Sequence, residues 1–424
     1  MCGFAGFAEA GGNIDRESCE TRLRKMGEAI VHRGPDAGGV WLNDALSVGL
    51  SHRRLSILDL SPLGAQPMAS ASGRFVIAFN GEIYNFQALG EELAADGAYF
   101  RGHSDTEVML AAFEAWGVEA ALGRFAGMFA FALFDQQEQR LYLARDRMGE
   151  KPLYYGWQGG TLVFGSELRA LQQHPQWQGG INRGALPLLV RHNLIPAPHT
   201  IYSGIFKLLP ASFVAVDLAR LEPGQLPEPS RYWRLEDQFA ESDDWTVEAA
   251  ADHLEALLTS VIGEQMVSDV PLGAFLSGGV DSSTVVALMQ RQASTPVKTF
   301  SIGFNEEGFN EAEHAAAVAG YLGTDHTELY VTERNARDLV PRLPQIYDEP
   351  FADSSQLPTY LVSEMTRKHV TVALSGDGGD ELFCGYTRYP GMLRGWQRRR
   401  SFGSRLKALS GRLPPGLTAQ AIRT

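Results

Sequence analysis

A cysteine stands at position 2, directly after Met1, in the opening stretch MCGFAGFAEAGG. Removal of Met1 would make Cys2 the first residue, which would then carry both a thiol and a free α-amine. A thiol has a reference pKa of about 8.5 and an α-amine one of about 7.7 to 8. The amine could therefore serve as general base for its own nucleophile, directly or through a water. Taken alone, however, a cysteine is more often a small buried hydrophobe.

Two glycine-rich turns in the second half of the chain indicate an anion site. GAFLSGGVDSSTVVALM (273–289) and VTVALSGDGGDELF (370–383) each have the order of a strand, a glycine-rich turn and a helix. Glycine lets the backbone approach a ligand closely, and a helix start offers unpaired N–H groups. No lysine follows the glycines, so neither turn is a GxxxxGK[ST] phosphate loop. The alternative is that these turns only link strands to helices.

The two turns can share one ligand if their strands are neighbours. In an open parallel sheet, ligands bind beyond the carboxyl ends of the strands, where the strand order reverses. Asp281 and Asp380 could then hold Mg²⁺, which is bound by one or two carboxylates together with phosphate oxygens.

Strands dominate the expected elements up to about residue 215. Short apolar runs such as RFVIAFN (74–80) are bounded by Gly, Asn, Asp and Pro, and MFAFALFD (128–135) with RLYLARD (140–146) predicts a hairpin. Helical spacing over 19–32 and 105–116 predicts two helices. Sheets covered by helices are therefore expected in this half.

The composition changes after this half. Residues 216–245 contain three prolines and no apolar periodicity, which predicts a linker. Beyond it, helical patterns alternate with apolar strands at 271–276, 298–304, 327–331 and 369–375. Such alternation predicts a parallel sheet wrapped by helices.

Bulk composition limits the class of protein. A chain of 424 residues suits two domains. A formal charge of −13 argues against a nucleic acid or an anionic membrane as the main partner. The three cysteines lack CxxC spacing, and no run of about 18 apolar residues occurs, so we expect a cytoplasmic protein without disulfides or membrane spans.

Several further segments carry a family resemblance. They are HRGPD (32–36), SHRRLSILDLSPLGAQPM (51–68), FNGEIYN (79–85), GHSDTEV (102–108) and ARDRMGEKPLYY (144–155). In this order they resemble the type-2 glutamine amidotransferases, N-terminal nucleophile hydrolases that release ammonia from glutamine. Joined to SGGVDSS and SGDGGDE, the chain resembles the glutamine-hydrolysing asparagine synthetases of the bacterial B type over nearly all of residues 2–390.

The resemblance implies a domain division. Residues 2–215 would form an α+β N-terminal nucleophile hydrolase domain, an αββα sandwich, followed by the linker 216–245. Residues 246–424 would form an α/β parallel-sheet domain of the PP-loop ATP pyrophosphatase type, similar to the adenine nucleotide α-hydrolases. The family's synthetase domain continues well past SGDGGDE, so we expect this second domain to be incomplete at its C-terminus.

The resemblance also implies the residues of a glutamine site. Cys2 would be the nucleophile that forms a glutamyl thioester, with Asn80 and Gly81 as oxyanion donors. The glutamine-binding set would be Arg54, Leu55, Ser56, Ile57, Leu58, Asn80, Gly81, Glu82 and Asp105, in which Arg54 clamps the α-carboxylate and the two acids help hold the α-ammonium. As alternatives, Asn80-Gly81 could be a hairpin turn and Arg54 or Asp105 a surface charge.

For the second site the resemblance implies ATP and Mg²⁺. The ATP-binding set would be Leu276, Ser277, Gly278, Gly279, Asp281, Ser282, Ser283, Ile302, Ser375 and Gly376. Asp281 and Asp380 would be the Mg²⁺ ligands. Asp377 stands where the family commonly has glutamate in SGEGSDE, a position associated with forming the acyl-adenylate. The carboxylate is retained but is one methylene shorter, so this departure bears on substrate choice rather than on the ATP chemistry.

The expected function is glutamine-dependent asparagine synthesis from aspartate and ATP, with a homodimer left open. One alternative amidates another carboxylate, such as a sugar acid or a peptide. The other is a truncated glutaminase or a scaffold that only binds nucleotide. Since free ammonia becomes ammonium in neutral water, a passage that excludes solvent should join the two sites.

Overall fold

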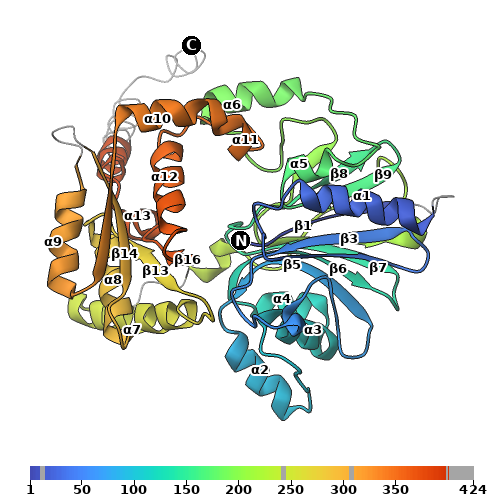
Figure 1. Ribbon diagram of the computed structural model, residues 1–424, viewed down its shortest axis with the longest axis horizontal. Coiled ribbons are helices and arrows are strands. Elements are labelled where there is room, and N and C mark those ends of the chain that lie inside the picture. The colour runs from blue at the N-terminus through green and yellow to red at the C-terminus, as the bar shows by residue number, and fades with distance from the viewer. Residues whose placement is uncertain (10–14, 240–244, 305–309, 398–399, 401–424) are drawn as a thin grey trace, which may run out of the picture.

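The computed structural model describes residues 1–9, 15–239, 245–304, 310–397 and 400. The chain forms a first domain of two stacked antiparallel sheets and a second domain built on a parallel sheet (Figure 1). The N-terminus lies on the side of the first domain that faces the second (Figure 1). Cys2 is therefore close to the boundary between the domains.

The first domain contains two six-stranded sheets. One sheet has the order β10-β8-β9-β1-β3-β2, with β1 (Gly3–Glu9), β2 (Ala37–Leu42), β3 (Val48–Arg54), β8 (Tyr154–Gln158), β9 (Thr161–Gly165) and β10 (Ile205–Lys207). The other has the order β12-β11-β7-β6-β5-β4, with β4 (Met68–Ala69), β5 (Phe75–Ile83), β6 (Gly127–Asp135), β7 (Arg140–Arg145), β11 (Ser212–Asp217) and β12 (Ser230–Arg231). The expected β6–β7 hairpin is confirmed, with Asp135 opposite Arg140.

Helices cover the outer face of each sheet. They are α1 (Arg16–Glu28) and α5 (Leu168–Leu171) on one side, and α2 (Phe86–Ala95), α3 (Asp105–Trp116) and α4 (Val118–Arg124) on the other. Strand β5 shows why the layers form: Phe75, Ile77 and Phe79 pack under α3, while Val76 and Ala78 join the core between the sheets. The αββα sandwich expected from the sequence is confirmed.

The second domain has the strand order β15-β14-β13-β16, all parallel. The strands are β13 (Leu272–Phe275), β14 (Lys298–Phe304), β15 (Asp325–Val331) and β16 (Val372–Leu374). Helices α7 (Val247–Gln265), α8 (Val280–Gln292) and α9 (Ala312–Leu322) pack on one face, and α12 (Gln356–Thr366) packs on the other. The order reverses between β13 and β16, so the strands that precede the two glycine-rich turns are neighbours. The condition for a ligand shared by the two turns is therefore met.

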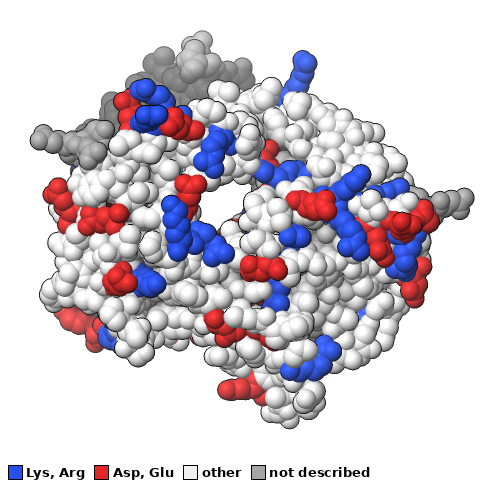
Figure 2. All heavy atoms as spheres, in the orientation of Figure 1, with Lys and Arg blue, Asp and Glu red and all other residues white. Residues whose placement is uncertain are grey.

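Shorter α-helices lie elsewhere in the described chain, among them α6 (Leu186–His192), α10 (Glu333–Leu339), α11 (Leu343–Ile346) and α13 (Gly379–Phe383). Figure 2 shows an opening between the two domains, with charged side chains on its rim. Among the described residues, no helix is both long enough and apolar enough to cross a membrane.

The expected linker is partly structured. Strand β12, which lies within 216–245, pairs with β11 of the first domain. Residues 240–244 of this segment lie outside the described part of the chain, as do residues 401–424 of the expected second domain. The division into 2–215, 216–245 and 246–424 stays a prediction.

Candidate active site

The Cys2 thiol is half-buried and is held by Leu55. The backbone N–H of Leu55 donates to Cys2 Sγ at 3.4 Å, and Sγ lies 3.5 Å from the Leu55 carbonyl oxygen. Burial raises the pKa of the thiol, the Leu55 N–H opposes that rise, and the Glu82 and Asp105 carboxylates add smaller increases. The thiol therefore needs a base before it can act as a nucleophile.

The α-amine at the chain start has the properties of such a base. Burial lowers its pKa to about 6, with further lowering by the charges of Arg33 and Lys151. At neutral pH the amine is mostly neutral and can accept a proton. In this chain the amine belongs to Met1, so the chemistry expected of Cys2 requires removal of Met1.

Asn80 is a buried amide without partners. It lies within strand β5 and has no exposed surface, yet neither Nδ2 nor Oδ1 has a hydrogen-bond partner among the described residues. A buried unsatisfied amide is costly, which points to a group that is bound there during function. The alternative of a hairpin turn at Asn80-Gly81 is wrong, because β5 continues to Ile83.

Gly81 permits close packing at the same point of β5. A Cβ at this position would lie 2.2 Å from the carbonyl oxygen of Met128 on β6. A larger residue would therefore push the two strands apart beside Asn80.

Two carboxylates lie near the end of β5 beyond Asn80: Glu82 on the strand itself and Asp105 at the start of α3. Asp105 begins α3 and accepts a hydrogen bond from the Ile83 N–H at 3.0 Å, which ties it to the end of β5. Burial raises the pKa of Asp105 to about 6, while burial and then the charge of Asp105 raise that of Glu82 well above its usual value. A bound ammonium group would favour the charged form of both carboxylates and so lower both pKa values.

Arg54 is buried, so the alternative of a surface charge is wrong for it, as it is for Asp105. Its Nη1 donates to the Ser61 carbonyl at 3.1 Å, and its Nη2 donates to the carbonyls of Leu58, at 3.2 Å, and Asp59. The guanidinium thus organises the loop of residues 58–61 and retains only part of its donors for a substrate carboxylate.

The other expected glutamine-binding residues of this segment, 55–58, lead from Arg54 into this loop. Ser56 N–H donates to Asp36 at 2.9 Å, and the Ile57 carbonyl accepts from the Asp269 N–H of the second domain at 3.0 Å. The Leu55 N–H donates to the Cys2 thiol, and the Leu58 carbonyl accepts from Arg54, as described above. The side chains that would touch glutamine stay a prediction.

Sequence reasoning did not single out three residues beside this site. Arg33 Nε donates to the Cys2 carbonyl at 2.9 Å, and His52 Nε2 donates to the Phe79 carbonyl at 2.9 Å, next to Asn80. The Lys151 ammonium is buried, between the sulfurs of Met1 at 2.8 Å and Met128 at 2.9 Å. Their segments HRGPD, SHRRLS and GEKPLYY carried the resemblance, which was the signal that could have found them.

The first glycine-rich turn leads from β13 into α8. Gly279 caps α8, Gly278 has φ of 80°, and a Cβ on Gly278 would lie 2.7 Å from the Ala315 N. Ser282 Oγ lies 3.0 Å from Ser277 Oγ, whereas the buried Oγ of Ser283 has no partner among the described residues. This arrangement leaves a hydroxyl and helix N–H groups for a bound anion.

The second turn, after β16, closes on the first. A Cβ on Gly376 would lie 2.8 Å from the Ser282 N, and one on Gly379 would lie 2.5 Å from Asp281 Cγ. Glycine at both positions therefore allows the turns to touch, and Asp380 follows immediately. Leu276 and Ile302 lie at the end of β13 and within β14.

The residues fit Mg²⁺ bound together with a nucleotide. The described residues contain no group of three or more acidic, histidine or cysteine side chains placed to hold a metal on their own. Asp281 lies against Gly379, and Asp380 is the next residue in the chain. Two acidic residues therefore adjoin the touching turns, which suits an ion that takes its other ligands from phosphates and water. Asp377 is exposed and accepts from Ser375 Oγ at 3.1 Å.

Comparison with known proteins supports this division of chemistry. Residues 1–233 match the family described as glutamine amidotransferase domain, and residues 253–424 match the family described as asparagine synthase. A putative glutamine-hydrolysing asparagine synthetase 2 of Methanocaldococcus jannaschii is 38% identical over 405 residues, covering 91% of this chain and 76% of that protein.

Two further relatives are longer than this chain. The glutamine-hydrolysing asparagine synthetase 1 of Bacillus subtilis is 35% identical over 92% of this chain and 59% of its own length. A putative glutamine-hydrolysing asparagine synthetase of Mycobacterium tuberculosis is 36% identical over 100% of this chain and 66% of its own length.

The fold and the site define a glutamine amidotransferase joined to an ATP-dependent ligase domain. The chain belongs to the family of glutamine-hydrolysing asparagine synthetases.

Proposed function

We propose that the protein makes asparagine from aspartate, using glutamine as nitrogen donor and ATP as energy source. The observation that carries this proposal is the buried Asn80 amide of β5, which has no hydrogen-bond partner among the described residues. Glu82 of the same strand and Asp105, bound to the Ile83 N–H, lie near enough to the Cys2 thiol to raise its pKa. That arrangement suits an amide substrate with a charged α-amino group, which is glutamine.

Glutamine hydrolysis would begin with removal of Met1. The Cys2 amine accepts the thiol proton, and the thiolate attacks the glutamine side-chain carbonyl, while Asn80 Nδ2 and the Gly81 N–H stabilise the oxyanion. Ammonia leaves with a proton returned by the amine, and a γ-glutamyl thioester remains on Cys2. Water then hydrolyses the thioester to glutamate and restores the thiol.

The second site would activate the acceptor. The aspartate side-chain carboxylate attacks the α-phosphate of ATP bound across the two turns, forming β-aspartyl-AMP and releasing pyrophosphate. Ammonia attacks this acyl-adenylate to give asparagine and AMP. Mg²⁺ held by Asp281 and Asp380 would neutralise phosphate charge, and Asp377 would lie beside the forming intermediate.

The test of the first half is glutamine hydrolysis in wild type and in Cys2→Ala. Wild type should release glutamate, and the variant should lose at least about 10³-fold in rate, because the nucleophile is gone. Mass spectrometry of the wild-type N-terminus should show Cys2 as the first residue. Equal rates in the two proteins would exclude the assignment of Cys2.

The test of the second half is pyrophosphate release. We expect release to require ATP, Mg²⁺ and aspartate together, and sugar acids or peptides to be poor replacements. Release that follows another acid instead would move the assignment to a different amide product.

The remaining proposals concern the setting of the enzyme. Three free cysteines without disulfides among the described residues suit a reducing compartment, so we place the enzyme in the cytoplasm. Its partners would be the small molecules glutamine, aspartate and ATP, and a homodimer is the assembly to test by sedimentation.

A further inference from the structure

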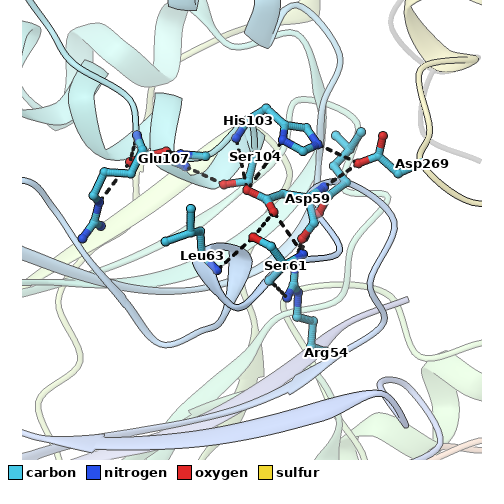
Figure 3. A network of polar contacts seen from close by, with 11 residues as sticks. Arg54, Asp59, Ser61, Leu63, His103, Ser104, Glu107 and Asp269 are labelled. Atoms are coloured by element: carbon cyan, nitrogen blue, oxygen red, sulfur yellow. Dashed lines mark hydrogen bonds and ion pairs between the residues drawn. The ribbon is translucent and has the colours of Figure 1, made fainter.

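The loop that follows Arg54 is held from both of its sides. On the inner side, Leu55 contacts the Cys2 thiol and Arg54 binds the carbonyls of residues 58–61. On the outer side, the backbone of the loop is bound by Asp269, a residue of the second domain (Figure 3). The loop therefore connects the nucleophile of one domain to the body of the other.

Asp269 makes three hydrogen bonds across the domain boundary. Its Oδ2 accepts from the Asp59 backbone N–H at 2.8 Å and from His103 Nε2 at 2.8 Å. Its own backbone N–H donates to the Ile57 carbonyl at 3.0 Å. Together these bonds fix the backbone on both sides of Leu58.

Asp59 needs such support because of its backbone conformation. Its φ is 53°, in the left-handed region that most residues avoid, and its side chain is buried. Asp59 Oδ1 accepts from the Ser61 N–H at 3.1 Å, and Oδ2 accepts from the His103 N–H at 3.1 Å (Figure 3). The turn at Asp59 is thus held by hydrogen bonds within the first domain, and its backbone is also bound by Asp269 of the second domain.

Charge strengthens the contact with His103. The hydrogen bond to Asp269 raises the pKa of His103, with smaller help from Asp59, whose Oδ2 lies 3.8 Å from His103 Nδ1. The same bond lowers the pKa of Asp269. The His103 imidazole therefore lies between two carboxylates that favour its protonated form, and it links the loop, the segment before α3 and the second domain.

The loop has room to move if the anchor is lost. A cavity of about 360 Å³ borders the contact and is lined by Leu58, Phe100, His103, Val267 and Asp269, among others. Leu58 could shift into this space, and the carbonyls that orient Arg54 would move with it.

We propose that Asp269 is a positioning residue for the glutamine site of the other domain. It anchors residues 57–59 so that Arg54, beside Asp105, keeps the orientation that receives the glutamine α-carboxylate. The inference rests on the proposed function of the first domain. Asp269 does not touch the thiol, so it should affect glutamine affinity more than the chemical step.

The test compares Asp269→Ala with Asp269→Asn in glutamine hydrolysis. The alanine variant loses both side-chain hydrogen bonds of Asp269. It should raise the KM for glutamine about five- to tenfold, with kcat within about twofold of wild type. The asparagine variant keeps an oxygen acceptor for the Asp59 N–H and should restore most of the affinity. Asp252→Ala, an exposed aspartate of α7, is the matched control and should be neutral.

His103→Leu covers the case in which Asp269→Ala does not fold. The His103 side chain is 65% exposed, so this substitution should be tolerated, and it removes one of the bonds to Asp269. A KM increase of about threefold is expected, smaller than for Asp269→Ala because the Asp59 N–H bond remains. An unchanged KM in the folded variants, or a loss confined to kcat, would overturn the inference.

Two measurements separate this inference from the proposed function. Calorimetric glutamine binding in a Cys2→Ala background requires no hydrolysis, so the affinity loss from Asp269→Ala should appear there too. Hydrogen exchange at the Asp59 amide should accelerate about tenfold in Asp269→Ala, whereas the Tyr84 amide, bound to the Ala126 carbonyl, should not change. Wild type that hydrolyses no glutamine refutes the function, whereas an unchanged Asp59 exchange rate refutes the anchor.

Discussion

The proposed oxyanion donor, Asn80, is the clearest feature at the scale of single residues. Asn80 is enclosed by the sandwich, and its position is set by β5 and by the His52 bond to the neighbouring Phe79 carbonyl. His52 stays neutral, because burial lowers its pKa to about 4. The amide is therefore held before substrate arrives, which is what electrostatic stabilisation of a transition state requires.

Asn80→Ala should lower the kcat of glutamine hydrolysis by about 10²–10³-fold, with a small effect on KM, because the amide acts on developing charge. Steady-state kinetics measure the split. Asn43→Ala is the matched control: Asn43 is also buried, but its amide is satisfied by Ser47 and Val48, so its loss should reduce stability and leave kcat unchanged. Equal kcat losses in both variants would contradict the role of Asn80.

A second residue-scale prediction concerns pH and Asp105. Burial raises its pKa to about 6 in the folded protein, whereas the unfolded chain has a pKa of about 3.9. The folded state thus binds the proton more tightly, so its stability falls as pH rises from about 4 to about 6, and the penalty is complete above that range. Asp105→Asn removes the charge and keeps an acceptor for the Ile83 N–H.

Asp105→Asn should therefore melt about 3 to 6 °C above wild type at pH 8 and near wild type at pH 4. Calorimetry at the two pH values provides the measurement. A difference of the same size at both would show that the charge is not the cause. If Asp105 receives the glutamine ammonium group as proposed, glutamine affinity should fall in the same variant, because the carboxylate is gone.

At the scale of elements, the nucleotide site depends on how closely two turns approach. The turns follow neighbouring strands β13 and β16 at the point where the strand order reverses. Gly376 lies against the Ser282 N, and Gly379 lies against Asp281. The approach brings Asp281 and the segment ending at Asp380 to one place.

Gly376→Ala should separate the turns, because its Cβ would meet backbone at 2.8 Å. We expect ATP affinity, measured by calorimetry, to fall about tenfold, while glutamine hydrolysis changes little. Gly320→Ala, in α9 with nothing within 4 Å of the added Cβ, is the control and should bind ATP normally. Unchanged ATP binding in Gly376→Ala would mean that the turns do not share the ligand.

At the scale of the whole molecule, a second set of contacts joins the domains on the side of α5. Arg169 Nε donates to Asp348 Oδ1 at 2.6 Å, and Arg169 Nη1 donates to the Gln345 carbonyl at 2.7 Å. Glu167 lies 3.0 Å from Arg169 and also binds Arg33, which holds the Cys2 carbonyl. Polar contacts therefore run from the nucleophile to the second domain here as well as through Asp269.

Arg169→Ala should weaken this interface by about 2 kcal/mol, because it removes charge-assisted bonds and leaves Asp348 buried without its partner. Hydrogen exchange over α11 should accelerate, and the thermal midpoint should fall by several degrees. Arg334→Ala removes an exposed pair with Asp338 and is expected to change the midpoint by less than about 1 °C. Protection of α11 that survives Arg169→Ala would contradict this account of the interface.

Much of the fold and of the candidate site could be predicted from local patterns. The spacing over 105–116 predicted α3 at Asp105–Trp116, and the alternating strands and helices predicted the parallel sheet. The adjacency of β13 and β16 was only a condition for a shared site, and the structure meets it. Periodicity and glycine-rich turns are local properties, so they can be recognised in the amino-acid sequence. Segment 369–375 yielded only a three-residue strand, because pairing with a neighbour sets strand length.

Cys2 and the two aspartates of the turns were named from residue type and position, and Asn80 and Asp105 from the resemblance to the amidotransferase family. Three features were decided only by the tertiary structure. The Asn80 amide has no hydrogen-bond partner among the described residues, Arg54 donates to carbonyls of its own loop, and Asp269 of the other domain holds that loop. The physical reason is that burial, hydrogen-bond satisfaction and charge proximity depend on residues distant in sequence, here Asp59 and Asp269. The sequence by itself determined which groups the enzyme has, and the packing of the two domains decided which of them remain free to bind a substrate.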